Sequence, residues 1–332
     1  WGSNTAATLM MIPIAIAVAE AGAGARDARN PFAAALILAV PYAANIGGMG
    51  TPVGTPTNLI AINYLTEAAG RSVSFMQWMV IGIPVVVLML PLAWVVLTRV
   101  SLKVDARAQG AAEAEVRGRL KALGRVSPPE ARIALLFGAV AILWIVREPL
   151  VTWLAPPHIQ ALDGTEIDAA IALLGAVLAF LIPAGGERGE GKALTDWETA
   201  VRLPWGAILL FGGGLSLAAA MGKTGLAAWL GAKMAGLSIL PALAMVLILV
   251  LLLVFLTELM SNVAMITTFM PVIAALALAG GIDIMTLAIP AAIAASCGFM
   301  LPAGTAPNAI AYGTGVISMN QMLRAGFWID IG

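Results

Sequence analysis

The stretch Trp1-Gly2-Ser3-Asn4-Thr5-Ala6-Ala7-Thr8 opens the chain and returns in altered form near residue 261. Ser3-Asn4-Thr5-Ala6 runs on to Pro13, and Ser261-Asn262-Val263-Ala264 runs on to Pro271, so Ser, Asn, Ala and Pro recur at equal spacing. A second matched pair follows. Gly48–Ala61 reads GMGTPVGTPTNLIA, Gly298–Ala311 reads GFMLPAGTAPNAIA, and seven of fourteen positions are identical. The chain is therefore an internal duplication with two polar motifs in each half.

The composition places these motifs in a membrane. Hydrophobic residues make up 61% of the 332 residues and charged residues only 11%, which exceeds what a soluble core needs. Apolar stretches of about 20 residues are long enough to cross a bilayer. We therefore predict an all-α polytopic membrane protein. The zero net charge suggests no nucleic-acid partner, and the single Cys297 excludes an internal disulfide framework.

The first half, residues 1–98, is predicted to be part of one repeat. Apolar residues 6–20 follow the Ser-Asn-Thr tip, and we interpret them as the second limb of a re-entrant hairpin, too short to cross the membrane. Residues 31–46 form a half-helix, a Gly/Pro-rich stretch is unwound, and helix resumes at 57–65. A full span follows at 77–97. Because the chain starts abruptly inside the first motif, we expect it to lack N-terminal helices.

The second half is predicted to repeat this plan after a charged linker at 99–132. We expect residues 133–332 to contain scaffold helices at 133–237, a complete second hairpin at 239–279, a broken helix at 286–316 and a truncated last helix from about 321.

The basic residues predict the orientation of the two halves. Of the 18 Lys and Arg, 14 fall in four alternate loops, at 22–30, 99–132, 184–202 and 317–325. The positive-inside rule makes these loops cytoplasmic. The first hairpin then enters from the cytoplasm and the second from outside, so the repeats are inverted. Inverted repeats with broken helices at the midplane are typical of secondary transporters.

The motif residues suit the binding of ions. Helices that begin or end inside the membrane leave backbone N–H groups at their N-termini and carbonyls at their C-termini. Carbonyls suit Na⁺, and N–H groups suit an anion. Ser, Asn and Thr add donors and acceptors without the cost of a fixed charge at membrane depth. We therefore expect a pocket that holds an anionic substrate between the two tips, with a cation beside each.

These motifs, together with Leu256-Thr257-Glu258 before the second tip, resemble the divalent anion/sodium symporter family over essentially the whole chain. The resemblance implies import of a di- or tricarboxylate, such as succinate, malate or fumarate, coupled to co-transported Na⁺. It further implies elevator-type alternating access, a homodimer surrounded by lipid, and a location in a bacterial inner (plasma) membrane.

The resemblance also implies a set of site residues in the tips and loops. Two sodium sites are expected, one at Ser3, Asn4 and Gly54, and the other at Thr257, Met260, Asn262 and Gly304. Substrate contacts are expected at Ser3, Asn4, Thr5, Thr55, Pro56, Ser261, Asn262 and Thr305.

Two positions depart from the family pattern: Val263 stands where a tip threonine is common, and Ala306 where a proline is common. The first departure bears on the choice of substrate. Glu258 lies near the predicted membrane centre, where an ionisable residue is functional by default, although it could instead brace the hairpin. We assign no site to His158 or Cys297.

Other classes of function remain open to different degrees. A sodium-independent dicarboxylate exchanger, or a symporter of sulfate or another oxyanion, would keep the same fold. An intramembrane protease would need paired aspartates, a Ser/His arrangement or HExxH, and none occurs in the predicted spans, so we expect no enzyme. A channel is least favoured, because rings of polar residues lining a pore are absent from the pattern.

Overall fold

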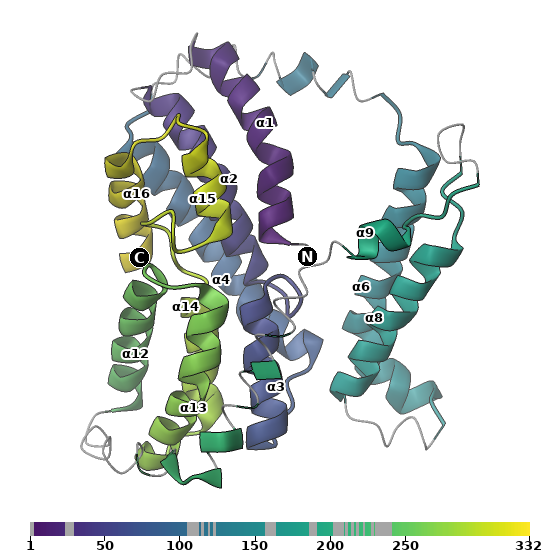
Figure 1. Cartoon of the computed structure of the whole chain (residues 1–332), viewed down its shortest axis with the longest axis vertical. Helices are drawn as coiled ribbons and strands as arrows, with labels where there is room; N and C mark the ends of the chain where they lie inside the picture. Colours follow the sequence, from purple (N-terminus) through teal and green to yellow (C-terminus); the bar gives the residue numbers. More distant parts are fainter. Residues whose placement is uncertain are drawn as a thin grey trace. The chain divides into compact units, whose positions relative to one another are not determined.

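The computed structural model describes residues 3–23, 30–104, 124–156, 164–185, 191–201 and 241–332, and isolated positions within 113–121 and 209–229. The elements formed by these residues are all helices (Figure 1), and their one strand-like contact is an isolated bridge between Pro183 and Ala193. The all-α prediction is confirmed. The chain forms two compact units: unit 1 contains Trp1–Arg71, Met79–Gly118 and Ala207–Gly332, and unit 2 contains Ser72–Trp78 and Arg119–Gly206.

Unit 1 begins with the helices of the first half. They are α1 (Asn4–Ala23), α2 (Pro31–Gly48), α3 (Pro56–Ala69), most of α4 (Phe75–Val95) and the π-helical turn η1 (Val96–Ser101). Capping residues mark the start of α2 and the end of α3. The side chain of Asn30 accepts hydrogen bonds from the first backbone N–H groups of α2, and Gly70 ends α3 with a φ of 63°.

The second half supplies five more helices of unit 1. They are α12 (Ala242–Thr257), α13 (Asn262–Gly280), α14 (Ile284–Ala294), α15 (Ala306–Gly313) and α16 (Met319–Ile331). The Asp283 carboxylate caps α14, and the N–H of Met285 and the guanidinium of Arg71 hold the pKa of Asp283 below its usual range.

The sequence underestimated the length of several helices. The length predicted for the first helix, 6–20, was too short: α1 has 20 residues, which by length and composition is enough to cross a membrane. The glycines at 47 and 48 were expected to break α2, yet α2 continues through Gly48. The second broken helix, predicted at 286–316, begins at Ile284 and unwinds after Ala294, where α14 ends. The scaffold helices predicted at 133–237 fall partly on residues that the structure does not describe, and His158 lies outside the described residues.

The helices of unit 1 pack in a reciprocal pattern between the halves. Within each half, α1 packs on α2 and α13 packs on α14. Across the halves, α1 and α2 both contact α15, and α13 and α14 both contact α3. Each of these contacts therefore has a counterpart when α1, α2 and α3 are exchanged with α13, α14 and α15. The duplication in the sequence is thus also a duplication in the packing.

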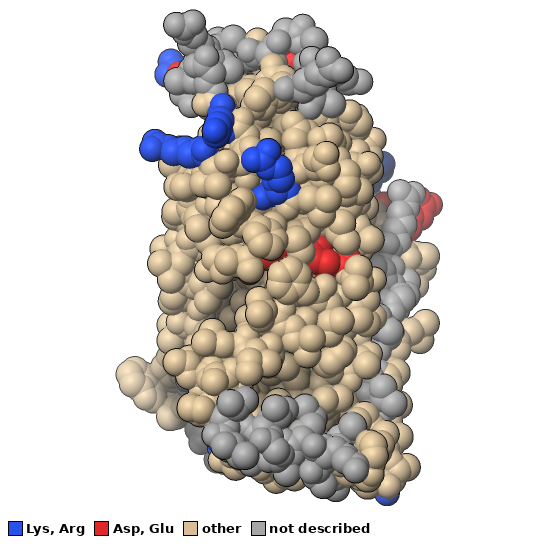
Figure 2. Space-filling view, turned by 90° about the vertical axis from the view of Figure 1, so that its left-hand side faces the viewer, with Lys and Arg blue, Asp and Glu red and all other residues tan. Residues whose placement is uncertain are grey.

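The surface of the helices is that of a membrane protein. Within the described part of the chain, five helices are long and apolar enough to cross a membrane, and large apolar side chains such as Leu88, Leu135 and Trp153 are exposed. Figure 2 shows one face on which uncharged residues cover a broad area, with Lys and Arg gathered toward one end and acidic residues near the middle. Such an apolar surface is stable only against lipid.

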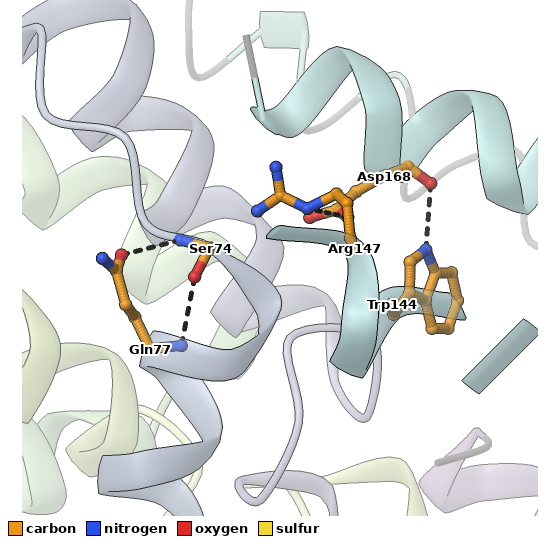
Figure 3. Close-up of polar contacts among 5 residues, drawn as sticks. All are labelled: Ser74, Gln77, Trp144, Arg147 and Asp168. Carbon is orange, nitrogen blue, oxygen red and sulfur yellow. Dashed lines mark hydrogen bonds and ion pairs between the residues drawn. The ribbon is translucent and has the colours of Figure 1, made fainter. Parts of the chain in front are cut away.

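Unit 2 contains α6 (Pro128–Leu154), α8 (Gly164–Leu181) and the short α9 (Trp197–Val201). An ion pair joins α6 to α8 (Figure 3): Arg147 Nε lies 3.0 Å from Asp168 Oδ1, and both side chains are largely buried. Trp144 Nε1 donates to the backbone carbonyl of Asp168 at 3.0 Å. The ring of Trp144 stacks on that of Phe75 with centroids 4.9 Å apart.

The ion pair in unit 2 gives a stability prediction. Asp168→Asn keeps the shape of the side chain but leaves the buried Arg147 charge without its carboxylate. Loss of one partner of a buried pair costs about 3 to 5 kcal/mol, and we expect the lower end because Asp168 remains 21% exposed. Thermal unfolding of the full-length protein in detergent measures this loss. Trp144→Phe is the uncharged comparison at the same contact: it removes one neutral hydrogen bond, worth about 1 kcal/mol, and part of the ring that stacks on Phe75, but leaves the ion pair in place. Equal melting temperatures for wild type and Asp168→Asn would contradict the prediction.

Candidate functional site

Two unwound segments, residues 49–55 and 295–305, interrupt the helices at the matched Gly-Thr-Pro motifs. In each, one buried asparagine amide binds the backbone of its own loop. Asn58 Nδ2 donates to the carbonyls of Gly48 (3.1 Å) and Thr51 (2.8 Å). Asn308 Nδ2 donates to those of Gly298 (2.8 Å) and Leu301 (3.2 Å). Each donor and acceptor of the first loop has its counterpart 250 positions later in the second. The same pair of hydrogen bonds therefore holds the two loops in the same conformation.

The first tip and the first loop bring several oxygens together. In the orientation of the structure, Asn4 Oδ1 lies 2.9 Å from the carbonyl oxygen of Ala44 and 3.3 Å from that of Gly54. In the present orientation three oxygens converge with no hydrogen between them; with the amide turned over, which satisfies both its oxygen and its nitrogen, N–H groups point at the two carbonyls instead. Gly48 permits this close approach of Asn4, because a Cβ there would lie 2.5 Å from Asn4 Oδ1.

A second group of oxygens lies at the second tip. Thr257 Oγ1 is 2.7 Å from Asn262 Oδ1 and 3.0 Å from the carbonyl oxygen of Ala295. The hydroxyl has a single hydrogen and can serve only one of these acceptors at a time. Gly304 lies against the same turn, since a Cβ there would be 3.4 Å from the carbonyl oxygen of Thr257. Met260 lies in this turn and is half-buried.

Glu258 braces the second loop. Its side chain is 2% exposed, and its two carboxylate oxygens accept hydrogen bonds from the backbone N–H groups of Met300 (2.8 Å) and Leu301 (2.7 Å). Hydrogen bonds to a charged acceptor are stronger than neutral ones. Of the two roles considered from the sequence, the bracing role is the one with contacts in the structure.

The residues expected to contact substrate fall into two groups. The tip residues lie toward the surface of unit 1: Ser3, Pro56 and Ser261 are exposed, and Asn4, Thr5 and Asn262 are half-buried. Thr55 and Thr305 are buried instead, at 6% and 8% exposure. Their hydroxyls take part in hydrogen bonds inside unit 1.

Two polar links connect the halves at these buried threonines. Asn45 Nδ2 donates to Thr305 Oγ1 at 3.1 Å, and Asn45 Oδ1 accepts from Asn4 Nδ2 at 3.4 Å. On the other side, Thr57 Oγ1 lies 2.9 Å from Ser296 Oγ and donates to Thr55 Oγ1 at 3.2 Å.

Several of these residues were missed in the sequence analysis. The carbonyls of Ala44 and Ala295 have no signature in side chains, so only the position of each helix end could have indicated them. Asn45 and Ser296 are each a lone polar residue in an apolar stretch close to a Gly/Pro-rich segment. That pattern is a weak indication of a buried polar contact.

The all-helical fold and its long apolar helices define a polytopic membrane protein. Comparison with known proteins agrees. The family described as "Sodium:sulfate symporter transmembrane region" matches residues 2–332, and the chain belongs to this family. Membership in a family of symporters points to a transport protein rather than an enzyme.

Two relatives illustrate the similarity. A protein of Staphylococcus saprophyticus named "Sodium-dependent dicarboxylate transporter SdcS" is 39% identical over 336 residues. A protein of the same name from Staphylococcus aureus is 36% identical over 336 residues. The alignments cover 99% of this chain and 63% of each relative, so the chain spans less than two thirds of the relatives' length.

The matched glycines of the two loops should differ in their tolerance of alanine. A Cβ at Gly54 would collide with the backbone carbonyl of Gly48, whereas a Cβ at Gly304 would meet Glu258 Oε2 at 3.2 Å. We expect Gly54→Ala to cost about 1 to 3 kcal/mol of stability through overpacking, and Gly304→Ala to cost less. Thermal unfolding of the two full-length variants side by side measures the difference. A larger loss for Gly304→Ala would show that the first loop is not the tighter one.

Proposed function

We propose that the protein from which this chain comes is a secondary active transporter that couples the import of a dicarboxylate to Na⁺. The observation that carries the proposal is the group of oxygens at the second tip, where Thr257 Oγ1 lies beside Asn262 Oδ1 and the carbonyl of Ala295; at the first tip, the amide of Asn4 lies against the carbonyls of Ala44 and Gly54. Both tips combine neutral polar side chains with backbone carbonyls at helix breaks, which is how secondary transporters bind Na⁺.

The same loops also supply groups that can bind an anion, namely the backbone N–H groups at the starts of helices. Helices α1, α3, α13 and α15 all begin at a tip or at an unwound segment. The first N–H groups of a helix carry a partial positive charge and bind carboxylates or phosphates readily. A dianion held near these N-termini would gain from cations bound beside it. The tip residues Ser3, Asn4, Thr5, Ser261 and Asn262, with Thr55, Pro56 and Thr305 in the loops, are the proposed substrate contacts.

The proposal extends to the arrangement in the membrane. The reciprocal packing of the halves supports two repeats related by a pseudo-two-fold axis, and the distribution of Lys and Arg supports their inverted orientation. We include re-entrant hairpins, elevator-type movement of one unit, a homodimer and an inner-membrane location in the proposal. The separation of the chain into two compact units is compatible with a moving unit and a scaffold.

The nature of the anion is the main alternative. The family description names sulfate, whereas the relatives are named dicarboxylate transporters. We favour a C4-dicarboxylate such as succinate, because the identity with the dicarboxylate transporters extends over nearly the whole chain. A sodium-independent exchanger is the second candidate, and the oxygens grouped at the second tip argue against it.

Uptake into proteoliposomes tests the proposal directly. Full-length protein should accumulate radiolabelled succinate when Na⁺ is outside, and should fail to do so when K⁺ replaces it. Unlabelled malate and fumarate should compete more strongly than sulfate. Equal uptake in the two salts would favour the exchanger, and stronger competition by sulfate would favour an oxyanion symporter.

Thr257→Ala separates sodium binding from substrate binding. It removes the hydroxyl at the centre of the second oxygen group, whereas Thr257 lies outside the proposed substrate contacts. Loss of one such interaction is worth on the order of 1 to 3 kcal/mol, so the Na⁺ concentration for half-maximal uptake should rise, while the order of preference among succinate, malate and fumarate stays the same. Thr267→Val is the control, because Thr267 Oγ1 is buried on α13 without a hydrogen-bond partner among the described residues. An unchanged sodium dependence in Thr257→Ala would exclude the second oxygen group as a sodium site.

A further inference from the structure

Helix α2 contacts the second unwound segment through two buried polar side chains, Tyr42 and Asn45. They are three residues apart and therefore lie on one face of the helix. Tyr42 Oη donates to the carbonyl of Phe299 at 2.7 Å, and Asn45 Nδ2 donates to Thr305 Oγ1 at 3.1 Å. Both side chains are at most 2% exposed. A helix of the first half thus holds the loop of the second half at two points.

Both side chains have a second partner, the carbonyl of Met322 for Tyr42 and Asn4 for Asn45, so only Asn45 is linked to the first tip. Asn45 Oδ1 accepts from Asn4 Nδ2 at 3.4 Å. The Asn4 amide has two orientations: with its oxygen toward the carbonyls of Ala44 and Gly54, its nitrogen is directed to Asn45, and with the amide turned over, the nitrogen donates to those carbonyls and the bond to Asn45 is lost. A cation bound by the oxygen would hold the amide in the first orientation. It would thereby preserve the hydrogen bond to Asn45.

The duplication does not reproduce this link. Asn45 corresponds to Ala295 in the second half, which has no polar side chain, and Thr305 corresponds to Thr55. Thr55 is reached by a different pair, Thr57 and Ser296. The chain Asn4–Asn45–Thr305 is therefore a specific feature of one side of unit 1.

We propose that Asn45 is a positioning residue that couples cation binding at the first tip to the substrate-facing loop of the second half. Its amide transmits the orientation of Asn4 to the hydroxyl of Thr305, which also accepts the N–H of Asn308 at the start of α15. Asn45 need not touch the cation or the substrate. The inference rests on the proposed sodium-coupled transport, since it names a residue that carries the coupling.

The test is a binding cycle on purified full-length protein. Succinate affinity is measured without Na⁺ and at saturating Na⁺, and Na⁺ affinity without and with saturating succinate. The ratio in each pair is the coupling factor, and the two ratios must agree by linkage. In Asn45→Ala, we expect the coupling factor to fall by about five-fold, the effect of one hydrogen bond. Asn45→Ser, which is too short to reach both partners, should also lower it and serves if the alanine variant does not fold.

Tyr42→Phe is the matched control. It removes a buried hydrogen bond to the same unwound segment, from the same face of the same helix, but leaves Asn4 untouched. It should lower thermal stability and leave the coupling factor at the wild-type value. If Tyr42→Phe lowers the factor as much as Asn45→Ala does, or if neither Asn45 variant changes it, the role of Asn45 is purely structural and the inference is wrong. A wild-type protein in which Na⁺ leaves succinate affinity unchanged would instead overturn the proposed function itself.

Discussion

The closure of two backbone loops by the amides of Asn58 and Asn308 is the interaction on which the rest of unit 1 depends. An unwound segment inside an apolar protein leaves carbonyls and N–H groups without helical partners, and each unpaired group costs several kcal/mol in lipid. Each amide binds two carbonyls of its own loop. The carbonyls of Gly54 and Ala295 at the breaks, and that of Ala44 near the end of α2, lie against the side chains of Asn4 and Thr257. These contacts exist because the loops are held open by side chains instead of being rewound into helix.

Close packing supports both loops from outside. A Cβ on Gly82 of α4 would lie 2.6 Å from the carbonyl oxygen of Met49, and one on Gly326 of α16 would collide with the backbone at Phe299. In each half, the helix that follows the broken helix thus lies directly on the unwound backbone. The second loop has an additional brace in Glu258, which binds two backbone N–H groups that no helix could satisfy. The two loops are thus held by the same kind of asparagine contact and by a closely packed helix, but only the second is also held by a glutamate.

The sequence predicted the elements that depend on repeated local signals. The matched Ser-Asn and Gly-Thr motifs indicated the tips, the two loops and the family, because Asn58 and Asn308 carry the same bonds at the same spacing. The sequence did not predict where the helices end. Gly47 and Gly48 remain helical because α1 needs a close approach there, with Asn4 packed on Gly48, and glycine is compatible with either conformation. The contacts made by Asn45 and Ser296 could not be predicted, since they depend on tertiary packing between segments more than 200 residues apart.

The reciprocal packing has a consequence for the biosynthesis of the protein. Helices α1 and α2 pack on α15, and Asn45 is hydrogen-bonded to a residue that follows it by 260 positions. At about 5 to 20 residues per second, a ribosome needs roughly 10 to 50 seconds to add that length of chain. During this interval the polar face of α2 has no partner from the second half. The first half must therefore wait in the membrane, with Tyr42 and Asn45 exposed to lipid, water or a membrane chaperone, until translation of the second loop is complete.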